Sequence, residues 1–205
     1  MTARAAKSFV LRHRIGLSVI GLSLALSPVP LLLVNPWKLG ILNLIALHAI
    51  VVLGLNLFVG YAGQISLGHA AFFGLGAYGS AILTTALAVR PLAAMALTGT
   101  GVALMALVVG IPTLRLSGHY LAMATLGFNI IVHHIFIEWD QVTGGPSGLT
   151  GIPAFAVPGL TFQGEVSQYY LLWGAAMLAL NLSLNLVRSG IGRGLAALAL
   201  SLIHI

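Results

Sequence analysis

Residues 54–80 read GLNLFVGYAGQISLGHAAFFGLGAYGS and set seven glycines and several polar side chains into an otherwise apolar part of the chain. Each glycine inside a helix costs about 0.5–1 kcal/mol relative to alanine, so helix stability does not explain so many of them. The polar side chains, with the glycines between and beside them, give the candidate residues Asn56, Tyr61, Gly63, Gln64, Ser66, Gly68 and His69. Hydrogen-bonding groups therefore gather where the backbone is least constrained, which indicates a functional site.

The composition is that of a membrane protein. The 205 residues are 59% hydrophobic and only 6% charged, with a mean hydropathy of +1.06, whereas a soluble domain is about 25% charged. At about 20 apolar residues per span, the chain holds about six transmembrane helices and no separate soluble domain. We therefore expect an all-α, polytopic membrane protein with one domain over residues 1–205. The net charge of +6 flanks apolar runs, as orientation signals do, which argues against nucleic-acid binding.

The expected spans follow the apolar runs, each of which ends at Pro, Gly or a charged residue. They cover residues 15–34, 41–60, 70–89, 92–111, 119–137 and 169–188. The first follows a basic tail, and we interpret it as an uncleaved helix and not a signal peptide, because Pro28 hinders cleavage after Ser27. Pro28 and Pro30 should kink the outer end of this helix.

Charge predicts the orientation of the spans. If residues 41–89 cross the membrane twice, seven Lys and Arg residues share the side of the N-terminus and two lie opposite; one crossing gives five and four. The positive-inside rule favours two crossings, with the N-terminus and Arg193 in the cytoplasm. The acidic residues Glu138, Asp140 and Glu165 then lie outside.

The connection at 61–69 contains no Lys or Arg, although this orientation places it toward the cytoplasm. Irregular backbone at membrane depth is tolerated only when it is buried in protein or lines a watery cavity. We therefore expect a broken or re-entrant element that lines a solute path, as in many transporters. The alternative is a tight hairpin whose glycines only permit close packing. Ala70, Gly74, Ala77 and Ala81 then form a small-residue stripe for a neighbouring helix.

Three motifs carry a family resemblance: GLNLFVGYAGQISLGHAAFFGLGAY at 54–78, LRLSGHYLAMATLGF at 114–128 and WDQVTGGPSGLTGI at 139–152. In order and spacing they resemble the permease subunits of branched-chain amino acid ABC transporters, of the LivM type, over about residues 40–195. The resemblance implies a permease in the bacterial inner membrane, without catalytic residues. It implies as partners a second homologous permease subunit, two cytoplasmic ATPase subunits and a periplasmic solute-binding protein. The chain has no G-x-x-x-x-G-K-[ST] motif, so we expect no cofactor and expect ATP to be bound by the partner subunits.

The segment 138–168 is the longest polar stretch, and by the predicted orientation it is a periplasmic loop. It resembles the family's TGGPxG loop at Thr143, Gly144, Gly145, Pro146 and Gly148. Loops of about 30 residues are usually functional or disordered. We expect a contact with the solute-binding protein, with an inert connector as the alternative.

Other functions remain open at this point. Relatives that carry urea or short amides have very similar motifs, and no residue here separates them from carriers of branched-chain amino acids. A haem-binding membrane cytochrome is the alternative of another class, because five histidines lie in or beside the spans: His48, His69, His119, His133 and His134. A secondary transporter is disfavoured because the spans lack buried acidic residues.

The end of the sequence also departs from the resemblance. Residues 187–198 resemble the entry into the family's cytoplasmic coupling region, but the residues after them carry no charge. We therefore expect an incomplete permease domain at the C-terminus that neither binds the ATPase stably nor supports ATP-dependent uptake alone.

Overall fold

The computed structural model describes residues 21–32, 35–113, 116, 118–157 and 160–203. The chain divides into two compact units, residues 1–53 with 164–186 and residues 54–163 with 187–205, which we describe separately. Part of the predicted first span, at 15–20 and 33–34, lies outside the described residues.

In the first unit, residues 21–26 form a helix that a turn at Ser27 and Pro28 separates from α2 (Val29–Leu32). Pro30 lies within α2. A proline has no N–H, so the carbonyl four residues before it loses its helical partner. The Ser27 hydroxyl donates to the carbonyl of Leu24 at 2.9 Å, where Pro28 cannot. The predicted interruption at the prolines is therefore confirmed within the described residues.

Helix α8 (Glu165–Arg188) supplies donors to the same interruption. The Tyr169 hydroxyl donates to the carbonyl of Leu26 at 3.0 Å, which is the group that Pro30 leaves without a backbone partner. The Tyr170 hydroxyl donates to the carbonyl of Ser27 at 3.0 Å. Tyr169 is 1% exposed. These two bonds join the proline-interrupted helix to the first turns of α8.

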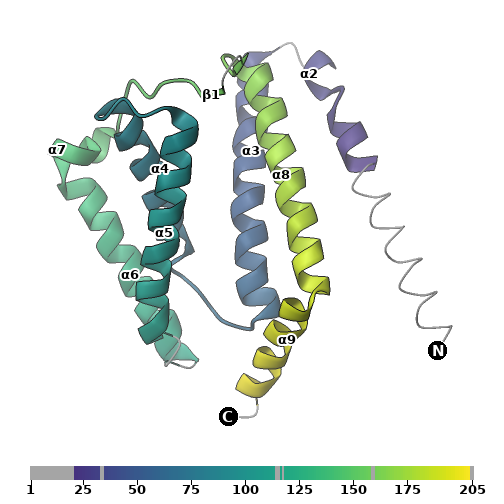
Figure 1. The fold of residues 1–205 in the computed structure, drawn as a ribbon, viewed down its shortest axis with the longest axis vertical. Coiled ribbons are helices and arrows are strands. Elements are labelled where there is room, and N and C mark those ends of the chain that lie inside the picture. Colours follow the sequence, from purple (N-terminus) through teal and green to yellow (C-terminus); the bar gives the residue numbers. More distant parts are fainter. Residues whose placement is uncertain (1–20, 33–34, 114–115, 117, 158–159, 204–205) are drawn as a thin grey trace. The chain divides into compact units, whose positions relative to one another are not determined.

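Helices α3 (Pro36–Asn56) and α8 meet near their N-terminal ends. The Asn43 side-chain amide donates to the Glu165 carboxylate at 2.9 Å and to its backbone carbonyl at 3.2 Å. Figure 1 shows both helices running in the same direction from this contact. Within this unit Lys38 and Glu165 therefore lie at the same end of the helices.

The second unit is built around α4 (His69–Thr85), α5 (Pro91–Thr113) and α6 (His119–Glu138). The ring of Phe72 packs near that of Phe128 with centroids 5.1 Å apart, and Tyr78 stacks on Phe136 at 4.4 Å, so α4 and α6 run parallel. Helix α5 comes between these two helices in the sequence and runs in the opposite direction. Residues 62–68, which precede α4, therefore lie at the same end of this unit as the last turn of α5 and the first turn of α6.

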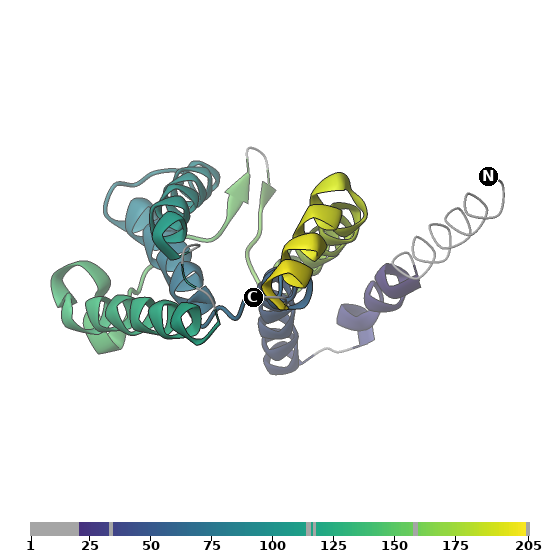
Figure 2. The ribbon, with the colours of Figure 1, turned by 90° about the horizontal axis from the view of Figure 1, so that it is seen from below.

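Short elements complete the second unit: the π-helix η1 (Leu57–Tyr61), α7 (Asp140–Thr143), the 3-10 helix η2 (Gly145–Ser147), β1 (Ala156–Val157), β2 (Leu160–Thr161) and α9 (Gly190–Ile203). The strands pair antiparallel, with Ala156 opposite Thr161 and Val157 opposite Leu160. Figure 2 shows the two arrows of this hairpin side by side. Helix α9 packs against η1.

The all-α membrane fold is confirmed. Within the described residues, four helices are long and apolar enough to cross a membrane, at Pro36–Tyr61, α5, α6 and α8. They contain the predicted spans 41–60, 92–111, 119–137 and 169–188. Their large side chains stay exposed in the isolated chain, as with Val108 at 71%, which is the expected surface for lipid or partner helices.

The predicted span at 70–89 is shorter in the structure. Helix α4 has 17 residues and ends at Thr85. Pro91 disfavours helical backbone at Arg90, and Ala88 adopts a left-handed conformation with φ of 50°, so residues 86–90 form a turn. Helix α5 begins at Pro91, a residue suited to a first helical position.

The predicted small-residue stripe on α4 is only partly correct. Ala81 is buried, and a Cβ on Gly74 would lie 2.6 Å from the ring of Phe136 in α6. Ala70 and Ala77 are exposed. A second glycine off the stripe, Gly79, faces Thr98 of α5 at 2.6 Å by the same measure. The close contacts thus lie on two faces of α4, because two helices pack against it.

Candidate functional site

The backbone leaves the α-helical pattern directly after α3. In η1 the N–H of Ala62 bonds the carbonyl of Leu57 at 3.2 Å, and the N–H of Gln64 reaches back to the carbonyl of Phe58 at 3.2 Å. Gly63 has a φ of 65°, which L-residues with a side chain rarely adopt. The predicted break in the helix is therefore confirmed, and π-helical turns of this kind are frequent at functional sites.

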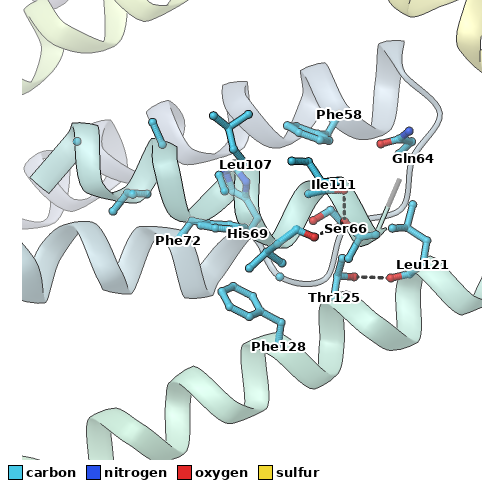
Figure 3. Close-up of a pocket in the computed structure, with 18 residues that line it drawn as sticks. Phe58, Gln64, Ser66, His69, Phe72, Leu107, Ile111, Leu121, Thr125 and Phe128 are labelled. Carbon is cyan, nitrogen blue, oxygen red and sulfur yellow. Dashed lines mark hydrogen bonds between the residues drawn. The ribbon is translucent and has the colours of Figure 1, made fainter. Parts of the chain in front are cut away.

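A cavity of about 590 Å³ lies between this segment and helices α4, α5 and α6. Small-molecule sites in proteins usually measure about 300–1,000 Å³. Figure 3 shows Gln64 beside Phe58 towards one end of the cavity and Phe72 towards the other, with Ser66 and His69 between them. The irregular segment and the first turn of α4 thus form one polar wall.

Four of the seven candidate residues line this cavity: Gln64, Ser66, Gly68 and His69. The other three lie beside it in the same segment. The Asn56 side chain rests against Gly60 one turn on, because a Cβ at Gly60 would lie 2.6 Å from its Oδ1. Tyr61 is 36% exposed. Gly63 provides the positive φ of 65° at the break after α3.

The lining residues that sequence reasoning missed are mostly apolar. Five of them are Phe58 in η1, Phe72 in α4, and Leu121, Thr125 and Phe128 in α6. The rest come from α5, where Gly99, Ala103, Ala106 and Gly110 form a face of small residues along the cavity. Their spacing of four, three and four residues repeats the pattern noted for α4, where it indicated helix packing, so the spacing alone does not identify a cavity wall.

The cavity lining has few polar groups. Among the described residues that line it there is no Asp, Glu, Lys or Arg, and its polar groups are the amide of Gln64, the hydroxyls of Ser66, Thr113 and Thr125, and the ring of His69. Helix α4 begins at this wall, with Gly68 as an N-cap that provides no side-chain bond. The positive end of the α4 dipole and its first N–H groups therefore lie at the cavity.

The TGGPSG motif folds as a compact turn at the end of α6. Thr143 is 3% exposed, and its hydroxyl bonds the carbonyls of Phe136 at 2.7 Å and Trp139 at 2.9 Å. The N–H of Gly145 donates to the same oxygen at 3.2 Å. Gly144 and Gly148 both have positive φ, and a Cβ on Gly144 would strike the carbonyl of Gly148. These residues determine the shape of the turn, whereas Pro146 and Ser147 are exposed.

The histidines behind the haem alternative occupy several different positions in the described part of the chain. His48 bonds the carbonyl of Leu44 in its own helix at 2.8 Å. His133 and His134 are neighbours on α6 with ring centroids 6.2 Å apart, and both are exposed. No group of three or more His, Asp or Glu residues gathers among the residues described. Adjacent residues of one helix point about 100° apart, so His133 and His134 cannot ligate the two faces of one haem.

Taken together, helices that are long and apolar enough to span a membrane, a broken helix and a cavity without Asp, Glu, Lys or Arg beside the break define a multi-pass membrane protein of the transporter class. Comparison with known families shows which family of transport proteins it is. The family described as the permease component of the branched-chain amino acid transport system matches residues 38–203, and the chain belongs to that family.

Two curated proteins are similar to part of the chain. They are the high-affinity branched-chain amino acid transport system permease proteins LivM of Escherichia coli (strain K12) and of Salmonella typhimurium (strain LT2). Each is 35% identical over 130 residues, which is 63% of this chain and 31% of the relative. The chain thus spans about a third of the length of these relatives. No solved structure matches the chain significantly.

Proposed function

We propose that the chain forms part of the solute pathway of a permease subunit in a bacterial ABC importer for branched-chain amino acids. One observation carries this proposal: the irregular segment at 62–68 puts Gln64 and Ser66 on the wall of a mostly apolar cavity within a membrane-spanning unit. Such a wall is what irregular backbone at membrane depth is expected to form. Family membership supports the same function.

The chemistry of the cavity suits a neutral solute with an aliphatic part. The small-residue face of α5 and the rings of Phe72 and Phe128 offer an apolar surface to a branched side chain. The uncapped start of α4 and the side chains of Gln64 and Ser66 offer hydrogen bonds to the polar end of the solute, with the helix N-terminus favouring its carboxylate. Urea and short amides would leave most of this apolar lining without a contact, so the lining favours the aliphatic amino acids.

The chain itself carries no catalytic role in this proposal. Energy comes from ATP bound by two cytoplasmic ATPase subunits, and the chain needs no cofactor of its own. A second homologous permease subunit completes the pathway, and a periplasmic solute-binding protein delivers the solute. We place the protein in the inner membrane with its N-terminus in the cytoplasm, as the distribution of Lys and Arg favours.

In this arrangement the segment 138–168 faces the periplasm. Its compact turn presents Pro146 and Ser147 outward from α6, which suits a contact with the solute-binding protein. The buried bonds of Thr143 support a contact surface of fixed shape and not a loose connector.

Uptake of radiolabelled leucine tests the proposal, with the full-length native protein and its partner subunits expressed in a host without its own leucine uptake. Gln64→Leu removes the amide from the cavity wall, and we expect at least about a tenfold loss, equivalent to about 1.4 kcal/mol. Asn181→Leu is the matched control, because that amide bonds the carbonyl of Met177 in its own helix at 2.9 Å and lies outside the cavity lining.

The outcome also separates the candidate solutes. Excess unlabelled isoleucine should abolish leucine uptake, and excess urea should leave it unchanged. Equal uptake by the Gln64→Leu and native proteins, at equal amounts in the membrane, would contradict the assignment of the cavity. Strong competition by urea would contradict the assignment of the solute.

A further inference from the structure

The irregular segment is tied to α6 by one side chain. The N–H of Leu67 donates to the Thr125 hydroxyl at 3.1 Å, across 58 residues of sequence. The same hydroxyl lies 3.0 Å from the carbonyl of Leu121 and 3.1 Å from that of Ala122, to which it donates. A hydroxyl has one proton and two acceptor positions, so it can serve its own helix and Leu67 at the same time.

Close packing surrounds this bond. Gly68 is buried, and a Cβ there would lie 3.0 Å from the backbone carbonyl oxygen of Thr125 and 3.5 Å from the ring of Phe128. One turn further on, Phe72 and Phe128 pack with ring centroids 5.1 Å apart. The backbone at Gly68 therefore lies directly on α6, and the bond from Leu67 sets how the segment enters this contact.

The residues of the polar wall lie between two fixed points. At one end, the N–H of Gln64 bonds the carbonyl of Phe58 in η1 at 3.2 Å. At the other end, the N–H of Leu67 bonds Thr125. Figure 3 shows Ser66 at the cavity. Ser66 directly precedes Leu67, so its position there depends on the second bond.

We propose that Thr125 is a positioning residue for the solute site, whose hydroxyl holds residues 64–67 so that Ser66 and Gln64 face the cavity. The role in transport rests on the function proposed above, whereas the role in positioning the segment does not. Thr125→Val keeps the branched shape and removes the acceptor for Leu67. Thr125→Ser keeps the hydroxyl and removes only a methyl group.

A thiol placed at position 66 measures the position of the segment without reference to transport. The printed sequence contains no cysteine, so Ser66→Cys introduces a single reactive site into it. The full-length native protein, with its partner subunits, is treated in membranes with a small neutral thiol reagent, and the modified peptide is quantified by mass spectrometry. Thr113→Val is the matched control, because the Thr113 hydroxyl lines the same cavity but bonds the carbonyls of Val109 at 2.9 Å and Gly110 at 3.0 Å in its own helix.

We expect Thr125→Val, combined with Ser66→Cys, to change the labelling rate of the introduced thiol about fivefold, the factor that corresponds to about 1 kcal/mol for one hydrogen bond. Thr125→Ser should restore the rate measured with Ser66→Cys alone, and Thr113→Val should leave that rate unchanged. In the protein that keeps Ser66, Thr125→Val should also lower leucine uptake, with Thr125→Ser recovering most of it.

The two readouts fail independently. An unchanged labelling rate in Thr125→Val, or an equal change in Thr125→Ser, would overturn the positioning role whatever happens to uptake. A changed labelling rate with native leucine uptake would support the positioning of the segment and contradict the proposed solute site.

Discussion

The hydroxyl of Tyr169 is expected to stabilise the first unit by satisfying a carbonyl that a proline leaves without a helical partner. Tyr169→Phe keeps the ring, which packs near Trp173 with centroids 6.0 Å apart, and removes only the donor to Leu26 at 3.0 Å. An unsatisfied buried acceptor costs about 1–3 kcal/mol, and side-chain hydrogen bonds between membrane helices average about 0.6 kcal/mol. We therefore expect a loss of about 1–2 kcal/mol in the free energy of unfolding.

Equilibrium unfolding by SDS in mixed micelles, followed by far-UV circular dichroism, measures this loss. Tyr170→Phe is the control on the same turn of helix, since its hydroxyl bonds Ser27 at 3.0 Å but its side chain is 45% exposed. It should cost less than Tyr169→Phe.

A double-mutant cycle tests the cause. In Pro30→Ala the new backbone N–H can bond the carbonyl of Leu26, so this carbonyl no longer depends on the Tyr169 hydroxyl for a donor. Tyr169→Phe should then cost less than half as much as in the native background. An equal cost in both backgrounds would refute the reasoning, because the stabilisation would then come from something other than the carbonyl left by Pro30.

Two further predictions concern packing and orientation. Gly74→Leu should destabilise the second unit by more than about 2 kcal/mol, because its Cβ would lie 2.6 Å from the Phe136 ring. Gly76→Leu on the same helix is the control, because a Cβ there has no neighbour within 4 Å. Comparable SDS midpoints for the two variants would contradict this packing. A reporter that is active only in the cytoplasm should be active when fused after Arg193 and silent when inserted at Ser147, and the reverse pattern would invert the proposed orientation.

The spanning helices could be predicted from the sequence because apolar composition over about 20 residues is sufficient to identify them. Their ends depend on local chemistry that composition does not record. Helix α3 begins at Pro36, five residues before the predicted span, because proline suits the first position of a helix. Helix α8 begins at Glu165, four residues early, with an acidic residue in its first turn where the helix dipole favours it.

The candidate site was predictable where polar residues interrupt apolar sequence, as at Gln64 and Ser66. It was not predictable where the cavity wall consists of ordinary apolar residues. Gly99 and Ala103 in α5 resemble any small residues of a membrane helix, and only the helix arrangement shows that they face the cavity. Thr125 was missed for a related reason, since a threonine that bonds its own helix gives no sign in the sequence of a second bond to Leu67.

The turn at the end of α6 contains buried residues that support its shape and exposed residues that do not. Thr143 and Gly145 are buried and Gly144 lies against a carbonyl, so replacing any of them alters the outline that a partner would meet. Pro146 and Ser147 project from that outline without supporting it. If this turn makes the proposed contact with a solute-binding protein, substitutions at these two positions would change the affinity of that contact and leave the stability of the turn intact.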